Sequence, residues 1–269
     1  MRQRSSLARL LASAAMTAIL AAGLGGCQTM SDITGSITSS KADASPAADP
    51  RAQVEVYGER YRADPRNAEA ALAYGQALRA TGQRSQAVAV LEQATIKHAG
   101  NRPLLAAYGR ALADNGNFQQ AFDVLTRAHS PDNPDWRILS VQGTALDQLG
   151  RHDEARRYYD SALKIAPDEP SVLSNLGMSY VLSRELPKAE EVLRRAYAST
   201  RADARVRQNL GLVVGLQGRF AEAEGIVKAD LPAEEAAANV TYLKQMLSRK
   251  DNPRAGAGTI PVAALNRPD

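Results

Sequence analysis

The sequence predicts an all-α protein in which helix pairs stack into a solenoid. A glycine recurs every 34 residues, at Gly75, Gly109, Gly143, Gly177 and Gly211. An alanine follows twelve residues after each glycine, at Ala87, Ala121, Ala155, Ala189 and Ala223. Two columns that stay in phase over five periods of this length indicate repeated helix-turn-helix units, each packed on the next. The low aromatic content, 5%, agrees with a helical chain.

The first 26 residues are typical of a secretory signal peptide. Arg2, Arg4 and Arg9 precede an uncharged stretch, Leu10–Leu24, that is rich in alanine and leucine, and small residues follow it. An uncleaved membrane anchor is the alternative, but a spanning helix needs about 20 apolar residues. We therefore expect cleavage after residue 26.

Cys27 is the only cysteine, so an internal disulfide is excluded. The sequence Leu24-Gly25-Gly26-Cys27 resembles the lipobox of bacterial lipoproteins. That resemblance implies acylation of Cys27 and anchoring by two or three acyl chains, which hold a protein stably to a membrane. Because Gln28 rather than aspartate follows, the resemblance also implies sorting to the outer membrane, with the protein facing the periplasm. A free thiol at a chance position is the alternative.

Residues 27–50 consist largely of Ser, Thr, Ala, Asp and Gly, and we expect a flexible tether there. The formal charge of the whole chain is +4, and without the three arginines of the signal peptide 30 basic and 29 acidic residues remain, a net charge of +1. This balance gives no general attraction for nucleic acid, and none is expected as a partner.

Five full repeats begin at Ala68, Arg102, Trp136, Pro170 and Ala204. In the first repeat, Ala71, Tyr74 and Leu78 have the spacing of one buried helical face, and the second half of each repeat shows the same pattern. Four turns between the halves carry a glycine, at Gly82, Gly116, Gly150 and Gly218. The fourth repeat has Arg184 and Glu185 there, so we expect a distorted turn.

The recurring glycine lies inside the first helix of each repeat, where glycine costs about 1 kcal/mol relative to alanine. We expect that packing compensates for this cost. The glycine would face the recurring alanine of the second helix, so that the two axes approach closely.

These columns resemble the tetratricopeptide repeat, which has small residues at positions 8, 20 and 27 and often proline at position 32, as at Pro65 and Pro167. The resemblance implies a right-handed superhelical solenoid over residues 51–249. It would comprise a half-repeat, the five full repeats and a C-terminal capping helix at 232–249. Residues 250–269 are rich in Pro and Gly and are expected to form a disordered tail.

No pattern for catalysis stands out. His98, His129 and His152 are far apart in the sequence and have no metal-ligand spacing, and there is no nucleophile elbow or phosphate-binding loop. The pairs Glu190-Glu191 and Arg194-Arg195 are expected on solvated helix faces. We therefore expect no enzyme activity, no cofactor, no metal and no small-molecule substrate.

The resemblance places partner binding in the concave groove lined by the first helices. The corresponding groove positions here are Gln76, Arg79, Arg110, Asp114, Arg137, Ser140, Thr144, Asp147, Asn175, Met178, Gln208, Asn209 and Leu212. In peptide-binding relatives, an asparagine at the position of Asn175 and Asn209 hydrogen-bonds the backbone of the ligand; local capping or solvation is the alternative. The pattern of chaperone-tail binders is absent, because Leu72, Gln76 and Val141 occupy its clamp positions.

The groove is expected to change along its length. Repeats one to three offer charged side chains, and repeats four and five offer apolar ones that suit an amphipathic helix or an apolar peptide.

The combination of lipobox, tether and five repeats resembles the TadD family of lipoproteins of the tight-adherence (Flp) pilus system. That resemblance implies a periplasmic adaptor that assists assembly of the pilus secretin or a related component. An adaptor for cell-wall (peptidoglycan) enzymes or for outer-membrane barrel assembly would use the same parts and is the alternative.

Overall fold

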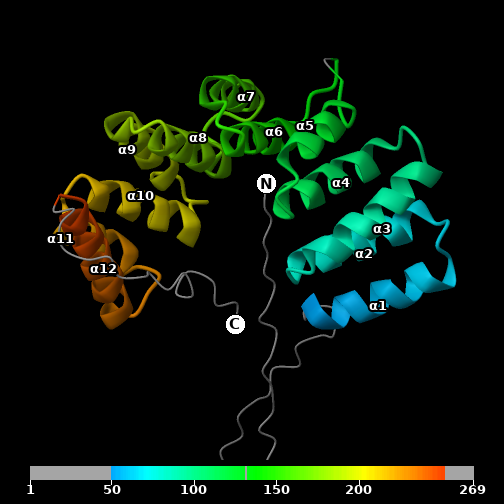
Figure 1. Cartoon of the computed structure of the whole chain (residues 1–269), viewed down its shortest axis with the longest axis horizontal. Helices are drawn as coiled ribbons and strands as arrows, with labels where there is room; N and C mark the ends of the chain where they lie inside the picture. Colours follow the sequence, from blue (N-terminus) through cyan, green and yellow to red (C-terminus); the bar gives the residue numbers. More distant parts are fainter. Residues whose placement is uncertain (1–49, 131, 252–269) are drawn as a thin grey trace, which may run out of the picture. The chain divides into compact units, whose positions relative to one another are not determined.

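The structure is a computed structural model that describes residues 50–130 and 132–251 (Figure 1). The expected signal peptide, Cys27, nearly all of the tether and most of the expected tail lie outside the described residues. The helices are α1 (Pro50–Ala63), α2 (Ala68–Ala80), α3 (Arg84–Lys97), α4 (Arg102–Asp114), α5 (Phe118–Thr126), α6 (Trp136–Gln148), α7 (His152–Ile165), α8 (Pro170–Leu182), α9 (Leu186–Tyr197), α10 (Ala204–Leu216), α11 (Phe220–Val227) and α12 (Ala233–Asp251). Within the described ranges there is no strand, and the expected all-α class is confirmed.

The helices form five antiparallel pairs, α2–α3, α4–α5, α6–α7, α8–α9 and α10–α11, with α1 packed on α2 and α12 packed on α10 and α11. The first helices of successive pairs also contact one another, from α2 through α10. The second helices contact only the helices adjacent to them in the sequence. Because only the first helices pack closely in their own layer, they form the inner layer of the stack. This is the expected superhelical tetratricopeptide-repeat solenoid.

The starts of the first helices are fixed by capping residues. The side chain of Asn67 accepts hydrogen bonds from the backbone N–H groups of Glu69 and Ala70, and Asn101, Asp135 and Asp203 cap the corresponding helices. Such caps satisfy backbone donors that have no partner inside the helix. Helix α8 begins instead with proline at its first position, where a missing N–H costs nothing.

The recurring glycines are packing positions, but their neighbour is not the expected alanine. A Cβ atom placed on Gly109 would lie 2.5 Å from the side chain of Leu125, sixteen residues later on α5. The other repeats pair their glycine in the same way with Leu91, Tyr159, Leu193 and Val227. The glycine therefore makes room for one bulky side chain, and the alanine column fills the rest of the interface, each of its members being 1% exposed or less.

The prediction of a distorted fourth turn is wrong. The backbone N–H of Arg184 bonds to the carbonyl of Val181 and that of Glu185 to the carbonyl of Tyr180, as the corresponding residues of the glycine-containing turns do. Arg184 reaches this geometry with a φ of 64°, close to the 74–86° of the four glycines. The stacking of repeats thus imposes the left-handed conformation on a residue for which it is sterically unfavourable.

No helix in the described part of the chain is both long and apolar enough to cross a bilayer.

Candidate partner-binding surface

The residues expected to bind a partner come from the inner layer of helices. We call the solvent-accessible side chains of α2, α4, α6, α8 and α10 in this layer the first-helix surface. Five of the expected residues are exposed: Gln76, Asp114, Arg137, Gln208 and Leu212. Six are half-buried: Arg79, Arg110, Thr144, Asn175, Met178 and Asn209. The other two, Ser140 and Asp147, are each only 6% exposed and lie inside the stack.

Three arginines from successive first helices form a cluster in the N-terminal part of this surface. Arg79 donates a hydrogen bond of 2.7 Å from Nε to Asp114 Oδ2. Arg137 lies 4.0 Å from the carboxylate of Asp135 and stacks over the ring of Trp136, with its guanidinium carbon 4.4 Å from the ring centroid. Burial lowers the pKa of Arg110 from its ordinary value, and the neighbouring Arg79 and Arg137 lower it further, while Asp135 and Asp114 oppose the shift.

The two asparagines expected to bind a ligand backbone make the same hydrogen bond inside the stack. Asn175 Nδ2 donates to Ser140 Oγ at 3.0 Å, and Asn209 Nδ2 donates to Ser174 Oγ at 2.9 Å. Each bond joins two neighbouring first helices. The amide nitrogens are therefore engaged in contacts between repeats, a role different from both ligand binding and the local capping or solvation named as the alternative.

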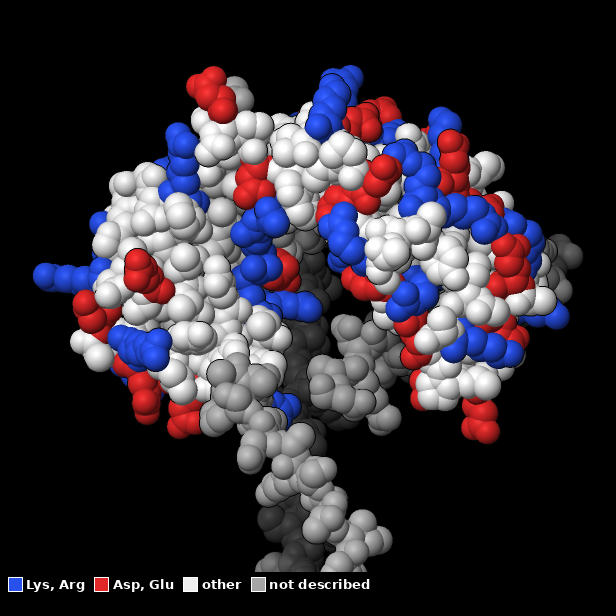
Figure 2. Space-filling model, turned by 180° about the vertical axis from the view of Figure 1, so that it is seen from behind, with Lys and Arg blue, Asp and Glu red and all other residues white. Residues whose placement is uncertain are grey.

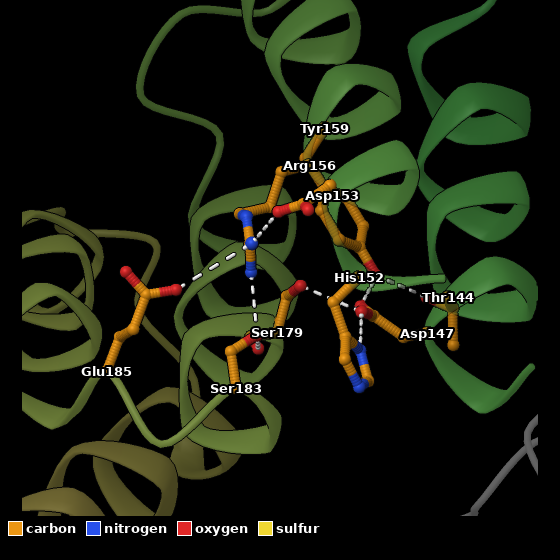
Figure 3. A network of polar contacts seen from close by, with 9 residues as sticks. All are labelled: Thr144, Asp147, His152, Asp153, Arg156, Tyr159, Ser179, Ser183 and Glu185. Atoms are coloured by element: carbon orange, nitrogen blue, oxygen red, sulfur yellow. Dashed lines mark hydrogen bonds and ion pairs between the residues drawn. The ribbon is translucent and has the colours of Figure 1, made fainter. Parts of the chain in front are cut away.

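Asp147 is the centre of a polar network rather than an exposed groove residue (Figure 3). Its carboxylate accepts hydrogen bonds from Ser179 Oγ at 2.8 Å and from the hydroxyl of Tyr159 at 2.9 Å. The Nδ1 atom of His152 lies 2.9 Å from the same carboxylate. These partners come from α7 and α8, so one buried carboxylate on α6 joins three helices of two repeats.

Burial raises the pKa of the Tyr159 hydroxyl strongly, and the negative charge of Asp147 adds to this effect. Tyr159 therefore stays a neutral donor throughout the physiological range. Ser179 and Tyr159 are almost completely buried, and so the carboxylate that satisfies them is part of the core. The network stabilises the junction between repeats three and four, and it engages both carboxylate oxygens of Asp147 inside the stack.

The C-terminal part of the first-helix surface is apolar, as expected. Leu182 on α8 is 49% exposed and Leu212 on α10 is 36% exposed, and Met178 on α8 is half-buried. Leu182 and Leu212 lie on neighbouring first helices and supply exposed apolar area at this end of the surface.

A second polar centre was missed, because Glu190 was expected on a solvated face. Its carboxylate accepts hydrogen bonds from Arg219, Gln217 and Arg194, and its side chain is only 15% exposed. Arg219 above all, together with Gln217 and Arg194, lowers the pKa of Glu190 to about 2. The only sequence signal for this centre is the 34-residue register, which places Glu190 of the fourth repeat beside the turn of the fifth.

No group of three potential metal ligands exists within residues 50–130 and 132–251. The structure therefore offers a surface of side chains, with no assembled cluster for metal chemistry among those residues.

Comparisons with known proteins agree with this architecture. A family model of the anaphase-promoting complex (cyclosome) subunit 3 matches residues 53–128, and two tetratricopeptide-repeat models match residues 109–170 and 146–213. A search of curated proteins finds no match.

Solved structures share the fold at low sequence identity. The APC/C hetero-tetramer Cut9-Hcn1 has a TM-score of 0.62 at 18% identity over 77% of this chain, and the matched region spans only 41% of that chain. PilW, described as a widely conserved type IV pilus biogenesis factor, has a TM-score of 0.62 at 18% identity and covers 72% of this chain and 92% of its own. TTC0263, a tetratricopeptide-repeat protein of Thermus thermophilus, has a TM-score of 0.56 at 21% identity, covering 68% of this chain and 97% of that one. Tetratricopeptide-repeat models thus match parts of this chain, and its fold is that of a tetratricopeptide-repeat solenoid. Proteins of this kind bind protein partners and are generally non-catalytic scaffolds.

Proposed function

We propose that this chain is a lipid-anchored scaffold on the periplasmic side of the outer membrane. It binds a protein partner through the first-helix surface and assists assembly or localisation of the secretin machinery of an Flp or type IV-like pilus.

The observation that carries the proposal is the first-helix surface itself. It runs from a polar cluster on α2, α4 and α6 to the exposed side chains of Leu182 and Leu212 on α8 and α10. Because Leu182 is 49% and Leu212 36% exposed, burying what remains of them would contribute about 0.5–1.5 kcal/mol each. A partner segment that covers these two leucines gains this free energy on binding, because the free protein leaves them in contact with water.

The anchor supports the location. The sequence Leu24-Gly25-Gly26-Cys27 precedes a tether of about 20 residues, and a random coil of that length has an average reach of about 25 Å. Acyl chains on Cys27 would hold the solenoid within this distance of the membrane. A membrane-bound partner then meets the surface at a high effective concentration, which strengthens binding without any new contact.

The pilus assignment has two supports. The arrangement of lipobox, tether and repeats resembles that of TadD, and the fold is similar to that of PilW, which its description assigns to type IV pilus biogenesis. At 18% identity the likeness to PilW concerns the fold alone. The assignment therefore depends on a test in the cell.

The test follows the detergent-resistant multimers of the pilus secretin in outer-membrane fractions. Four strains are compared with wild type: a deletion, Cys27→Ser, Leu182→Ser and Ile96→Ser. Ile96 is the matched control, because it is 68% exposed but lies on α3, outside the first-helix surface. We expect multimers to be lost in the deletion and reduced in Cys27→Ser and Leu182→Ser, with normal amounts in Ile96→Ser.

Unchanged multimers and normal piliation in the deletion would overturn the pilus role. The same deletion would then be examined for wall-hydrolase regulation and for barrel assembly, the roles of the alternative adaptor. Reduction in Cys27→Ser but not in Leu182→Ser would support the anchor and contradict the use of the apolar part of the surface.

A further inference from the structure

Within residues 50–130 and 132–251, Arg110 is the one member of the arginine cluster without an acceptor. Arg79 has Asp114 at 2.7 Å, and Arg137 has Asp135 at 4.0 Å. No hydrogen bond or ion pair within the described residues involves the guanidinium of Arg110. The five charged groups therefore leave a single positive charge, and that charge belongs to the arginine in the middle.

This arrangement is unfavourable for the free protein. Arg110 is half-buried, and a guanidinium that loses water without gaining an acceptor carries a desolvation penalty. Two further arginines beside it add repulsion, and the lowered pKa of Arg110 reflects both effects. An anion at this position would remove the penalty, because it would supply the missing acceptor and balance the extra charge.

We propose that Arg110 binds a carboxylate of the partner segment, which rests on the proposed function of the first-helix surface. A guanidinium presents parallel N–H donors that match the two oxygens of a carboxylate. The neighbouring positions on α4 are Ala106, Ala107 and Ala113, whose side chains offer the guanidinium no acceptor. Exposed Gln76 on α2 supplies a further amide within the same layer.

The charge balance selects the kind of anion. A phosphate group carries a charge of about −1.5 to −2 at neutral pH, so it would exceed the single unpaired positive charge and repel Asp114 and Asp135. A carboxylate carries one negative charge and matches it. The site is therefore suited to an acidic side chain or a chain terminus of a protein.

The apolar end of the surface sets the spacing of the partner's residues. Helix α4 and helix α8 are separated by two steps within the layer, about 16–20 Å at the usual distance between packed helices. An extended chain covers this distance in about five or six residues. The partner segment is thus an acidic residue followed or preceded, five or six positions away, by an aliphatic one.

The test measures binding of a fluorescent peptide to the full lipidated protein in detergent, at constant ionic strength. The probe is the amidated hexapeptide Glu-Ala-Ala-Ala-Ala-Leu, and its counterpart carries Gln in place of Glu. We expect the Glu peptide to bind wild type at least tenfold more tightly than the Gln peptide. Arg110→Gln should abolish this difference, and Arg110→Lys should weaken Glu binding several-fold because the paired donors are lost. Arg102→Gln is the matched control, an exposed arginine on the same helix, and should bind as wild type does.

Equal affinity for the two peptides, no binding of the Glu peptide, or full binding by Arg110→Gln would each overturn the proposal. Competition by inorganic phosphate that is stronger than competition by acetate would overturn the choice of a carboxylate. Thermal unfolding checks that Arg110→Gln is folded, and we expect the variant to be at least as stable as wild type. If the peptide-binding test fails but the secretin multimers still depend on the protein, the proposed function stands. The partner then binds elsewhere on the first-helix surface.

Discussion

The first two repeats and the last two are joined to their neighbours by different means. A single apolar cluster extends from Ala71 on α2 to Ile138 on α6. The polar contacts between these repeats are mostly neutral or directed to the main chain. Between repeats one and two they are the contact of Ser85 with Asn115, the hydrogen bond from the Tyr108 hydroxyl to Glu92, and the ion pair of Arg79 with Asp114. His98 and Lys97 contact the carbonyls of Arg66 and Pro65, which precede the first repeat.

The last repeats have smaller apolar clusters and more charge between them. Ion pairs that cross from one repeat to the next include Arg194 with Glu222, Arg219 with Glu190, Arg195 with Asp168, Arg201 with Glu169 and Arg156 with Glu185. Figure 2 shows basic and acidic side chains interleaved over the half of the view that holds these repeats.

One 34-residue template thus fixes the interior residues of every repeat, whereas the polar contacts between repeats vary along the chain. Each repeat contacts only its neighbours, so stability is close to a sum of local terms. One half can then depend on apolar burial and the other on ion pairs without a change of fold. Their responses to mutation and pH should differ accordingly.

The largest effect is expected at the junction between the two halves. Asp147→Ala removes the acceptor of the buried hydroxyls of Tyr159 and Ser179, and should lower the free energy of unfolding by about 3 kcal/mol. For a chain of this size the melting temperature should fall by about 6–12 °C. The control is Asp160→Ala on α7, an exposed residue whose loss should cost less than about 0.5 kcal/mol. Equal melting temperatures for the two variants would contradict the network's role in the core.

The apolar half is probed by Gly109→Ala. The added Cβ would lie 2.5 Å from Leu125, and overpacking of this kind costs about 1–3 kcal/mol, partly offset by the better helix propensity of alanine. A net loss of about 1–2 kcal/mol in urea unfolding is expected. Gly225→Ala on α11 is the control, since its Cβ would meet nothing and the variant should gain stability.

The charged half is probed by acid. The pKa of Glu190 is about 2 in the folded protein against an ordinary 4.5, so its contribution is fully present above about pH 4.5 and is lost as the pH falls towards 2. Glu190→Gln should cost about 1 kcal/mol at pH 7, as expected for a network of partly exposed ion pairs, and should flatten the stability profile between these pH values. Amide hydrogen exchange should locate the loss in α9 to α11. The exposed neighbour Glu191→Gln serves as the control, and an identical acid profile for the two variants would exclude a special role of Glu190.

The smallest expected effect is a gain. Arg184→Gly relieves the left-handed strain of the fourth turn, about 1–2 kcal/mol, while glycine adds flexibility to the unfolded chain. A net increase of about 0.5–1 kcal/mol in the free energy of unfolding is expected. The reverse change in the matching turn, Gly150→Arg, should destabilise by a similar amount. A loss of stability in Arg184→Gly would mean that its side chain contributes more than its strain costs.

The helical register could be predicted from the sequence because it depends on local spacing that repeats five times. The glycine and alanine columns indicate which residues face inward, and the first helices start at capping residues or proline. The same spacing could not show that Gly109 makes room for Leu125, since that pairing depends on the angle between two helices. It also misplaced Asp147, because a polar residue in an exposed column becomes buried only when its neighbours supply donors.

The all-α solenoid and the layer of helices that forms the first-helix surface could be predicted from the amino-acid sequence alone. Periodicity encodes these features, and packing only reinforces them. Which side chains of that surface already have hydrogen-bond or ion-pair partners on neighbouring helices became clear only from the packed structure. Asp147, Asn175 and Asn209 have partners on neighbouring helices, whereas Arg110 has none within the described residues. Hydrogen bonds and ion pairs depend on distances of a few ångströms between residues about 30 positions apart, and only the stacking of the repeats sets those distances.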